Sequence, residues 1–163
     1  MEDHAEPCPP AIARPGWFWR SKSFFQRIRA AVRGVYSRAK QLRTLLIVSD
    51  DNGFRKQLRT VFDPASGFDT CVQADSGMEA LAKIRELSPA LVVLDFLLPD
   101  MTGLQLARML KSTTPELPIF MLTMDYNVDI EKDARSCGIT AVFSKLDDLA
   151  PLAANARVVC GIE

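Results

Sequence analysis

The chain has 163 residues, of which 48% are hydrophobic and 25% charged, with 20 basic and 20 acidic side chains. This length suits one compact domain with an appendage, and the composition excludes wholesale disorder. No apolar run approaches the roughly 20 residues that a membrane-spanning helix needs.

The first 43 residues predict an extension that differs from the rest of the chain. Residues 1–43 carry nine basic and three acidic side chains, whereas residues 44–163 carry 11 basic and 17 acidic ones. Residues 5–16 are rich in proline and favour an irregular segment. From 23 to 40, apolar side chains recur at spacings of three and four between basic residues, which predicts an amphipathic helix. The apolar stripe consists of Phe25, Ile28, Val32, Val35, Tyr36 and Ala39.

Residues 44–163 predict a domain of five strands that alternate with five helices. Continuous apolar runs at 45–48, 91–94, 119–122 and 141–143 are typical of parallel strands covered on both faces. Residues 68–74 alternate instead, which favours an edge strand with one more exposed face. Helices are expected within 54–62, from a capping box at 76–79 to before Pro89, and from a second capping box at 102–105 to before Pro115. Two more are expected from about 128 to 137 and from about 147 to 159. This order predicts an α/β fold with a doubly wound sheet.

Polar side chains stand where the predicted strands end. Asp50 and Asp51 follow the first strand, Asp95 ends the third, Thr123 ends the fourth, and Lys145 comes after the fifth. The carboxyl ends of strands in such a sheet form the usual ligand site. Clustered carboxylates favour a divalent cation such as Mg²⁺, and one of them could act as a nucleophile toward a phosphoryl group. The alternative for the acidic pair is a helix cap, and for the others ordinary turn or surface chemistry.

Cysteine and histidine do not predict a zinc site. The four cysteines are scattered without a short Cys-x-x-Cys pair, and His4 is the only histidine. Free thiols in a reducing compartment are the better interpretation. The N-terminus lacks a signal-peptide pattern, which favours a cytoplasmic location.

Residues 44 to about 160 resemble the receiver domain of two-component response regulators. The resemblance is carried by the runs 46–51, 77–81, 118–123 and 138–145, and above all by the Asp-x-x-x-Pro-x-x-x-Gly spacing of Asp95, Pro99 and Gly103. It implies a flavodoxin-like, five-stranded parallel sheet in the order 2-1-3-4-5.

The resemblance also implies a role for each residue at the strand ends. Asp95 would accept a phosphoryl group from the phosphohistidine of a histidine kinase or a phosphotransfer protein. Thr123 and Lys145 would bind the phosphoryl oxygens. The implied Mg²⁺ ligands are Asp50 through water, Asp51 directly, Asp95, and the backbone carbonyl of Leu97.

Three departures from the family pattern affect the elements that would transmit a signal. Met124 stands where a small residue usually follows the switch hydroxyl, and it could narrow access to the site. Leu146 replaces a proline in a cis peptide, so we expect a trans or rearranged loop, because a non-proline cis bond costs about 2.5–4 kcal/mol. Val142 occupies the usual aromatic position, while Phe143 lies on the other face.

Two functions follow as hypotheses. The first is a phosphorylation-dependent signalling switch that binds a downstream protein, with no enzymatic activity beyond slow self-dephosphorylation. The alternative is a receiver-like interaction module that works without phosphorylation. A hydrolase is more distant, because Leu97 interrupts the Asp-x-Asp run that such enzymes would show.

The extension has three interpretations of its own. Residues 17–40 could bind an anionic membrane surface, a partner protein or a second copy, or the chain's own acidic domain. DNA binding is less favoured, because a single helix offers no base readout.

Overall fold

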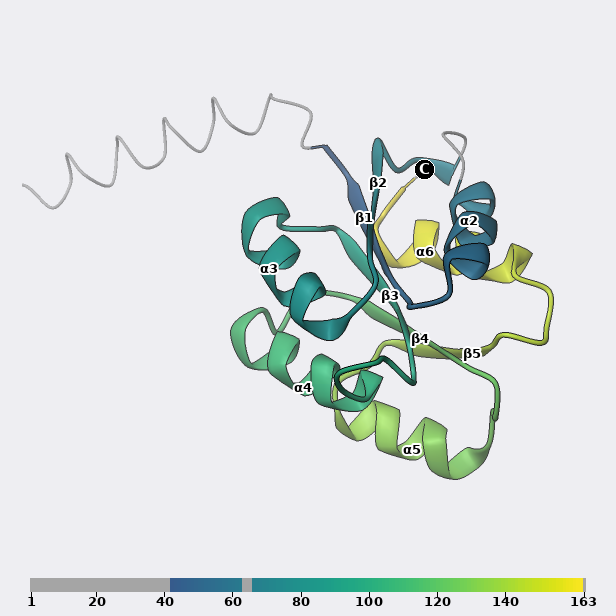
Figure 1. The fold of residues 1–163 in the computed structure, drawn as a ribbon. Helices are drawn as coiled ribbons and strands as arrows, with labels where there is room; N and C mark the ends of the chain where they lie inside the picture. The colour runs from purple at the N-terminus through teal and green to yellow at the C-terminus, as the bar shows by residue number, and fades with distance from the viewer. Residues whose placement is uncertain (1–41, 63–65, 163) are drawn as a thin grey trace, which may run out of the picture. The chain divides into compact units, whose positions relative to one another are not determined.

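The computed structural model describes residues 42–62 and 66–162, which form a five-stranded parallel sheet (Figure 1). The strands are β1 (Thr44–Val48), β2 (Thr70–Ala74), β3 (Leu91–Asp95), β4 (Ile119–Thr123) and β5 (Ala141–Ser144). Their order is β2-β1-β3-β4-β5. This confirms the predicted fold class and strand order, and it places β2 at an edge of the sheet.

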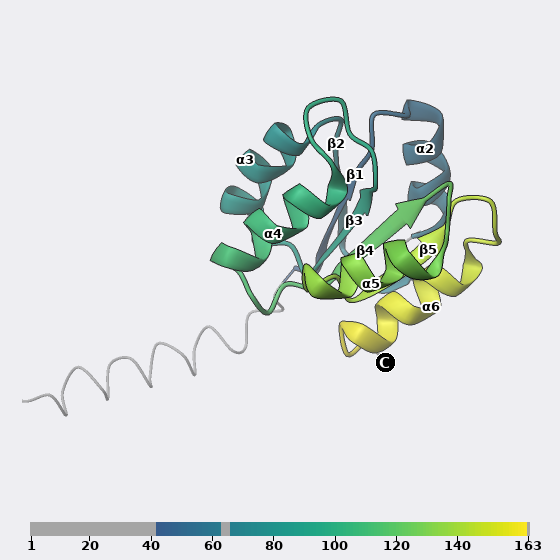
Figure 2. The same ribbon diagram turned by 90° about the horizontal axis from the view of Figure 1, so that it is seen from below.

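Five helices cover the two faces of the sheet. They are α2 (Asn52–Val61), α3 (Gly77–Leu87), α4 (Gly103–Thr113), α5 (Val128–Ser136) and α6 (Ala150–Val159). Helices α3, α4 and α5 contribute buried side chains to one core cluster, and α2 and α6 contribute to another. Figure 2 shows this division, with α2 and α6 on the opposite side of the sheet from the other three.

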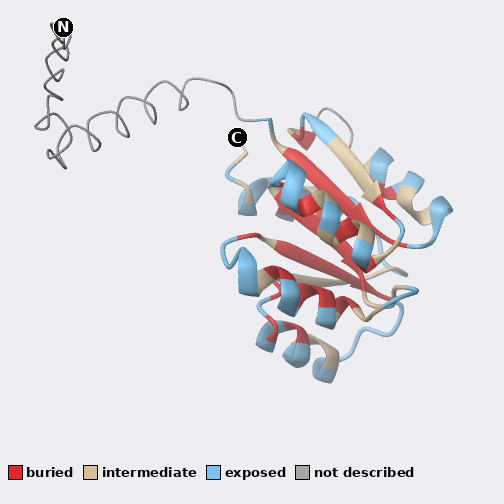
Figure 3. Cartoon of the chain, turned by 60° about the vertical axis from the view of Figure 1, so that its left-hand side comes forward, coloured by how far each residue is buried: buried red, intermediate tan, exposed pale blue. Residues whose placement is uncertain are grey.

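The central strands are buried because alternate side chains enter different clusters. In β1, Leu46 packs on the side of α3, α4 and α5, whereas Leu45 and Ile47 pack on the side of α2 and α6. Both faces of β1, β3 and β4 are therefore apolar, as the continuous runs predict. Figure 3 shows these strands as the most continuously buried part of the domain.

Side-chain caps fix where the helices next to the sheet begin. Thr102 and Gln105 form the predicted reciprocal capping box at α4. At α3 only half of the predicted box forms. The Ser76 hydroxyl accepts from the Glu79 amide, but the Glu79 carboxylate accepts from the amide of Asp75 rather than that of Ser76. The carboxylate also binds Lys83 one turn later, and this bond draws it away from the reciprocal position.

The last helix begins later than its sequence predicts. Asp147 and Asp148 look like its first turn, yet α6 starts at Ala150, with Pro151 in the first turn as expected. Leu149 is the N-cap residue and has no side-chain cap, and Asp148 lies before it, where its carboxylate accepts a hydrogen bond from the Ala150 amide at 3.0 Å. The predicted amphipathic helix at 23–40 lies outside the described residues. Within the described part of the chain, no helix is both long enough and apolar enough to cross a bilayer.

Candidate functional site

Asp95 is a buried carboxylate at the carboxyl end of the central strand β3. Its side chain is only 2% exposed. One oxygen, Oδ2, accepts a hydrogen bond from the Ser49 hydroxyl at 2.5 Å and lies 2.7 Å from the Lys145 ammonium. Because β1, β3 and β5 run in parallel, their carboxyl ends bring these three residues together from positions far apart in the sequence.

The other oxygen of Asp95 has no partner among the described residues. Oδ1 is buried and accepts no hydrogen bond. Burial raises the pKa of the Asp95 carboxyl, the bonds from Lys145 and Ser49 oppose that rise, and the nearby Asp50 carboxylate adds to it. A buried, unsatisfied carboxylate oxygen is costly, so the site favours a cation or an electrophile at this atom.

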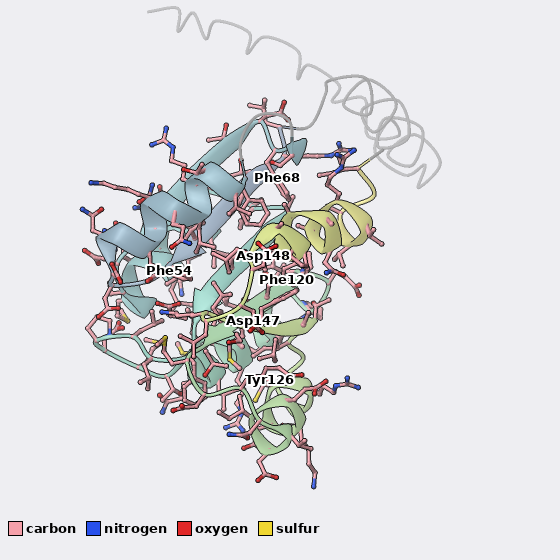
Figure 4. All side chains as sticks on the ribbon, turned by 90° about the vertical axis from the view of Figure 1, so that its right-hand side faces the viewer. Phe54, Phe68, Phe120, Tyr126, Asp147 and Asp148 are labelled. Atoms are coloured by element: carbon pink, nitrogen blue, oxygen red, sulfur yellow. The ribbon has the colours of Figure 1, made fainter. Side chains whose placement is uncertain are left out.

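The Lys145 ammonium is held between a carboxylate and an aromatic ring. Its Nζ lies 4.5 Å from the centroid of the Phe54 ring, and Phe54 belongs to the first turn of α2. Figure 4 shows Phe54 at that end of the helix. The Lys145 amide donates to the Thr123 carbonyl at 2.8 Å, which continues the pairing of β5 with β4.

The two adjacent acids after β1 occupy different environments. The Asp51 carboxylate caps α2, where its Oδ1 accepts from the amides of Gly53 at 2.8 Å and Phe54 at 3.0 Å. The Phe54 amide, and then that of Gly53, lower the pKa of Asp51. Asp50 instead lines the cavity beside Lys145. The structure therefore directs Asp50 toward the predicted site and engages Asp51 in the alternative role of a helix cap.

A cavity of about 280 Å³ opens at this rim. Its lining includes Asp50, Leu97, Thr123, Met124, Asp125 and Lys145. The side chains of Leu97 and Met124 are 68% and 56% exposed. Apolar side chains therefore stand at the cavity mouth, and Met124 lies where the sequence analysis expects it to restrict access.

Thr123 is buried at the end of β4, and its hydroxyl is already engaged. Thr123 is 3% exposed, and its Oγ1 accepts a hydrogen bond from the Asp125 amide at 3.2 Å. The hydroxyl proton remains able to donate. The structure thus places a potential donor at the cavity, on the strand adjacent to the one that carries Asp95.

The loop after Asp95 is fixed by two further residues. Gly103 starts α4 against the strand end, where a Cβ atom would collide with the Asp95 carbonyl oxygen and the Leu94 side chain. This close approach explains why the motif requires glycine. Asp100 accepts from the amides of Gly77 and Met78, each at 2.8 Å, and thereby ties the loop to the start of α3.

The aromatic arrangement beside β5 agrees with the sequence analysis. Val142 packs with the cluster under α3, α4 and α5, and Phe143 packs with the cluster under α2 and α6. The Phe143 ring lies 5.3 Å from that of Phe120, at an interplanar angle of 54°. Every peptide bond in the described residues is trans, including Lys145–Leu146, as predicted.

The sequence does not predict the contacts of two residues at the site. Ser49 directly follows the first strand, beside the acidic pair. Its position at the rim could therefore be predicted from the sequence, but its hydrogen bond to Asp95 could not. Phe54 belongs to the apolar stripe of its helix, and nothing in that pattern indicates a contact with Lys145. Within residues 42–62 and 66–162, no three His, Cys, Asp or Glu side chains are grouped to hold a metal ion.

Sequence comparison places the chain among known proteins. The family model described as "Response regulator receiver domain" matches residues 45–157. The chain is 34% identical over 121 residues to the phosphate regulon transcriptional regulatory protein PhoB of Pseudomonas aeruginosa, covering 71% of this chain and 52% of that protein. It is 40% identical over 82 residues to the DNA-binding response regulator MtrA of Mycobacterium tuberculosis, covering 50% of this chain and 35% of that protein. The chain thus spans about half or less of the length of these relatives.

Structural comparison agrees on the fold. A two-component response regulator from Clostridium difficile matches with a TM-score of 0.66 at 22% identity, covering 72% of this chain and 94% of that one. The chemotaxis response regulator CheY4 of Vibrio cholerae matches with a TM-score of 0.65 at 22% identity, covering 72% and 98%.

Proposed function

The chain belongs to the response regulator receiver domain family, and on that premise we propose that Asp95 accepts a phosphoryl group from a phosphohistidine protein. One observation carries the proposal. The Asp95 carboxylate is buried at the end of β3, with Oδ2 held by Ser49 and Lys145 and with Oδ1 unpartnered. This geometry fixes one oxygen of a buried carboxylate and leaves the other without a protein partner, beside the Lys145 ammonium that lines the cavity.

The transfer that we propose is a displacement at phosphorus. A carboxylate oxygen of Asp95 forms a new P–O bond, and the P–N bond of the donor phosphohistidine breaks. The electron pair of the broken bond stays on the donor nitrogen, and the donor ring, already protonated at its other nitrogen, leaves as neutral imidazole. Lys145 and Thr123 are proposed to bind the phosphoryl oxygens, because an ammonium and a hydroxyl at the same cavity can stabilise the added negative charge.

The residues present fit a hard divalent cation. Asp95 Oδ1 is a buried acceptor without a partner, and Asp50, which lines the cavity and whose charge acts on Asp95, supplies a second carboxylate nearby. We propose that Asp50, Asp51, Asp95 and the Leu97 carbonyl hold Mg²⁺, with Asp51 using the carboxylate oxygen that does not cap α2. When bound, Mg²⁺ would neutralise charge on the carboxylates and on the phosphoryl group.

A second candidate function is favoured by the altered residues around β5. Phe143 packs against Phe120 inside the α2 and α6 cluster, so its ring does not lie on the face covered by α5. Val142 takes the place of an aromatic ring on that face. A receiver surface that binds a partner equally well with and without phosphorylation would suit this arrangement.

The remaining assignments stay predictions. The division into an extension at 1–43 and a receiver domain at 44–163 is part of the proposal. We also propose that residues 17–40 contact an anionic membrane surface or a partner protein. Self-association of the chain is a further proposal. MtrA is named as DNA-binding, but this chain covers 35% of it. Our expectation that this chain does not bind DNA therefore rests on the sequence alone.

The assignment is tested by labelling the full chain with acetyl phosphate and Mg²⁺. We expect one hydroxylamine-labile phosphoryl group, located on Asp95 by mass spectrometry, and none in Asp95→Asn. Asp125→Asn is the matched control, because it removes a neighbouring carboxylate from the same cavity and should retain the label. A label that persists in Asp95→Asn would contradict the proposal.

A further inference from the structure

We infer that Phe54 is a positioning residue, whose ring holds the Lys145 ammonium against the acceptor carboxylate. Lys145 Nζ lies 2.7 Å from Asp95 Oδ2 and 4.5 Å from the Phe54 ring centroid. An ammonium within about 6 Å of a ring centroid is attracted by the negative face of the ring. This inference rests on the proposed function, because it assigns to Phe54 a part in the same acceptor site.

The lysine needs such support because its own loop gives little. Its stem is long and flexible, and the backbone after it is not fixed by a cis proline. Leu146, the next residue, is 71% exposed and so contributes little packing. The Lys145 amide is anchored to the Thr123 carbonyl, but that bond fixes the main chain and leaves the ammonium free to turn. The ring and the carboxylate together define its position.

The ring itself is positioned by the first turn of α2. Asp51 accepts a hydrogen bond from the Phe54 amide at 3.0 Å, which fixes the residue at the start of the helix. Arg55 donates to the Ser49 carbonyl and, at 3.2 Å, to Gln73, so the helix is tied to the ends of β1 and β2. Asp51 therefore acts on the site through the cap and the ring.

The arrangement also divides the two oxygens of the acceptor. Lys145 and Ser49 both bind Oδ2, and the ring restrains the ammonium from moving across to Oδ1. Oδ1 thus stays without a protein partner. A plain packing role for Phe54 is the competing explanation, since the residue is half-buried beside the α2 and α6 cluster. The two explanations differ in what an aliphatic replacement does to Lys145.

The first test is a ring-current measurement on the full chain, without ligand or phosphoryl donor. In protein labelled with ¹³C-lysine, the ε-methylene protons of Lys145 should be shifted upfield by the Phe54 ring, with the signal assigned by its loss in Lys145→Gln. Phe54→Leu should return the shift to the value of an ordinary lysine, and Phe54→Tyr should preserve it. An unchanged Lys145 signal in Phe54→Leu would overturn the inference.

The second test is the rate at which acetyl phosphate labels Asp95. Phe54→Leu should slow labelling about three- to tenfold, the range expected for a partly desolvated cation–π contact, and Phe54→Tyr should restore the rate. The control is Phe68→Leu. Phe68 packs edge-to-face against Phe62 at the far end of α2, with ring centroids 5.7 Å apart (Figure 4). Its replacement removes a ring from the same cluster as Phe54 without touching Lys145.

The outcomes distinguish a failure of the positioning role of Phe54 from a failure of the proposed phosphoacceptor function of Asp95. Equal slowing in Phe54→Leu and Phe68→Leu would reduce Phe54 to a packing residue, while labelling of Asp95 would stand. Absence of labelling in the wild-type chain would remove the proposed function, and the ring-current shift would then decide the position of Lys145 by itself.

Discussion

Two neighbouring regions of this domain are held in different ways. One is the acceptor corner, which consists of Ser49, Asp95 and Lys145, and the other is the pair of loops that follow β4 and β5. At the acceptor corner, Asp95 is 2% exposed and its bound oxygen takes two hydrogen bonds from Ser49 and Lys145. In the loops after β4 and β5, by contrast, Met124 and Leu146 are 56% and 71% exposed. Buried polar groups demand specific partners, whereas exposed apolar groups tolerate exchange. The comparison teaches that a buried carboxylate constrains its neighbours more tightly than the exposed apolar residues next to the same site are constrained.

Breaking the Lys145–Asp95 pair should have the largest effect. Lys145→Gln removes the charge opposite a buried carboxylate, so labelling of Asp95 should fall by more than tenfold. Stability should drop by about 1–2 kcal/mol, less than for a fully buried pair, because the Lys145 side chain is 18% exposed. Urea unfolding and labelling rates measure both. Lys83→Gln, which breaks the exposed pair with Glu79, is the control and should cost less than about 1 kcal/mol. Equal losses of stability in Lys145→Gln and Lys83→Gln would contradict the prediction that the buried pair contributes more than the exposed one.

Two glycines at the starts of helices should respond differently to a methyl group. Gly103→Ala should destabilise the domain by about 1–3 kcal/mol and slow labelling, because the new Cβ meets the Asp95 carbonyl oxygen, a backbone atom. Gly77→Ala should cost less, because its Cβ meets the flexible Met101 side chain. Thermal unfolding with labelling of Asp95 tests this. A larger loss of stability in Gly77→Ala than in Gly103→Ala would contradict this prediction, because it would show that the end of β3 can shift to accept the new methyl group.

The Asp100 carboxylate should make a pH-dependent contribution. The amides of Gly77 and Met78 hold its pKa below the ordinary value, so its charged form stabilises the folded state above the unfolded-state pKa, and this stabilisation is lost as the pH falls through the folded-state value. Asp100→Asn should therefore lower Tm at pH 7, and the gap from wild type should close below about pH 4. Asp133→Asn removes an exposed carboxylate on α5 as a control. A gap that persists in acid would exclude this charge effect.

The mouth of the cavity should show the smallest effect. Met124→Ala removes an exposed side chain from the cavity mouth, so a small donor such as acetyl phosphate should label Asp95 faster, by less than tenfold. Thermal stability should stay within about 0.5 kcal/mol of wild type, as for surface substitutions in general. Met109→Ala, at an exposed site on α4, is the matched control. Slower labelling in Met124→Ala would indicate that the side chain assists the donor.

Most of the fold could be predicted because the sheet is buried on both sides. The apolar runs that became β1, β3 and β4 leave little choice except parallel strands covered by helices. The start of α6 was harder to place. Asp147 and Asp148 are both acceptable first-turn residues. Only the chain path shows that both lie before the helix and that Leu149, at 6% exposed, is buried at its start.

The site could be predicted only in part, because strand ends locate residues but do not orient them. Asp95, Thr123 and Lys145 were placed at the rim by where their strands end. The separate environments of Asp50 and Asp51 depend on the residue at which α2 begins, and adjacent carboxylates look alike in sequence. Phe54 belongs to an apolar helical stripe, and such a stripe does not reveal which ring meets a cation.

The most direct test is an NMR titration of the full chain with beryllofluoride, which mimics an aspartyl phosphate, in the presence of Mg²⁺. An intact acceptor corner predicts stoichiometric binding that requires Mg²⁺, shifts the amide signals of Asp95, Thr123 and Lys145, and disappears in Asp95→Asn. Unchanged spectra of the wild-type chain at saturating beryllofluoride and Mg²⁺ would contradict the claim that the corner is a working phosphoacceptor site.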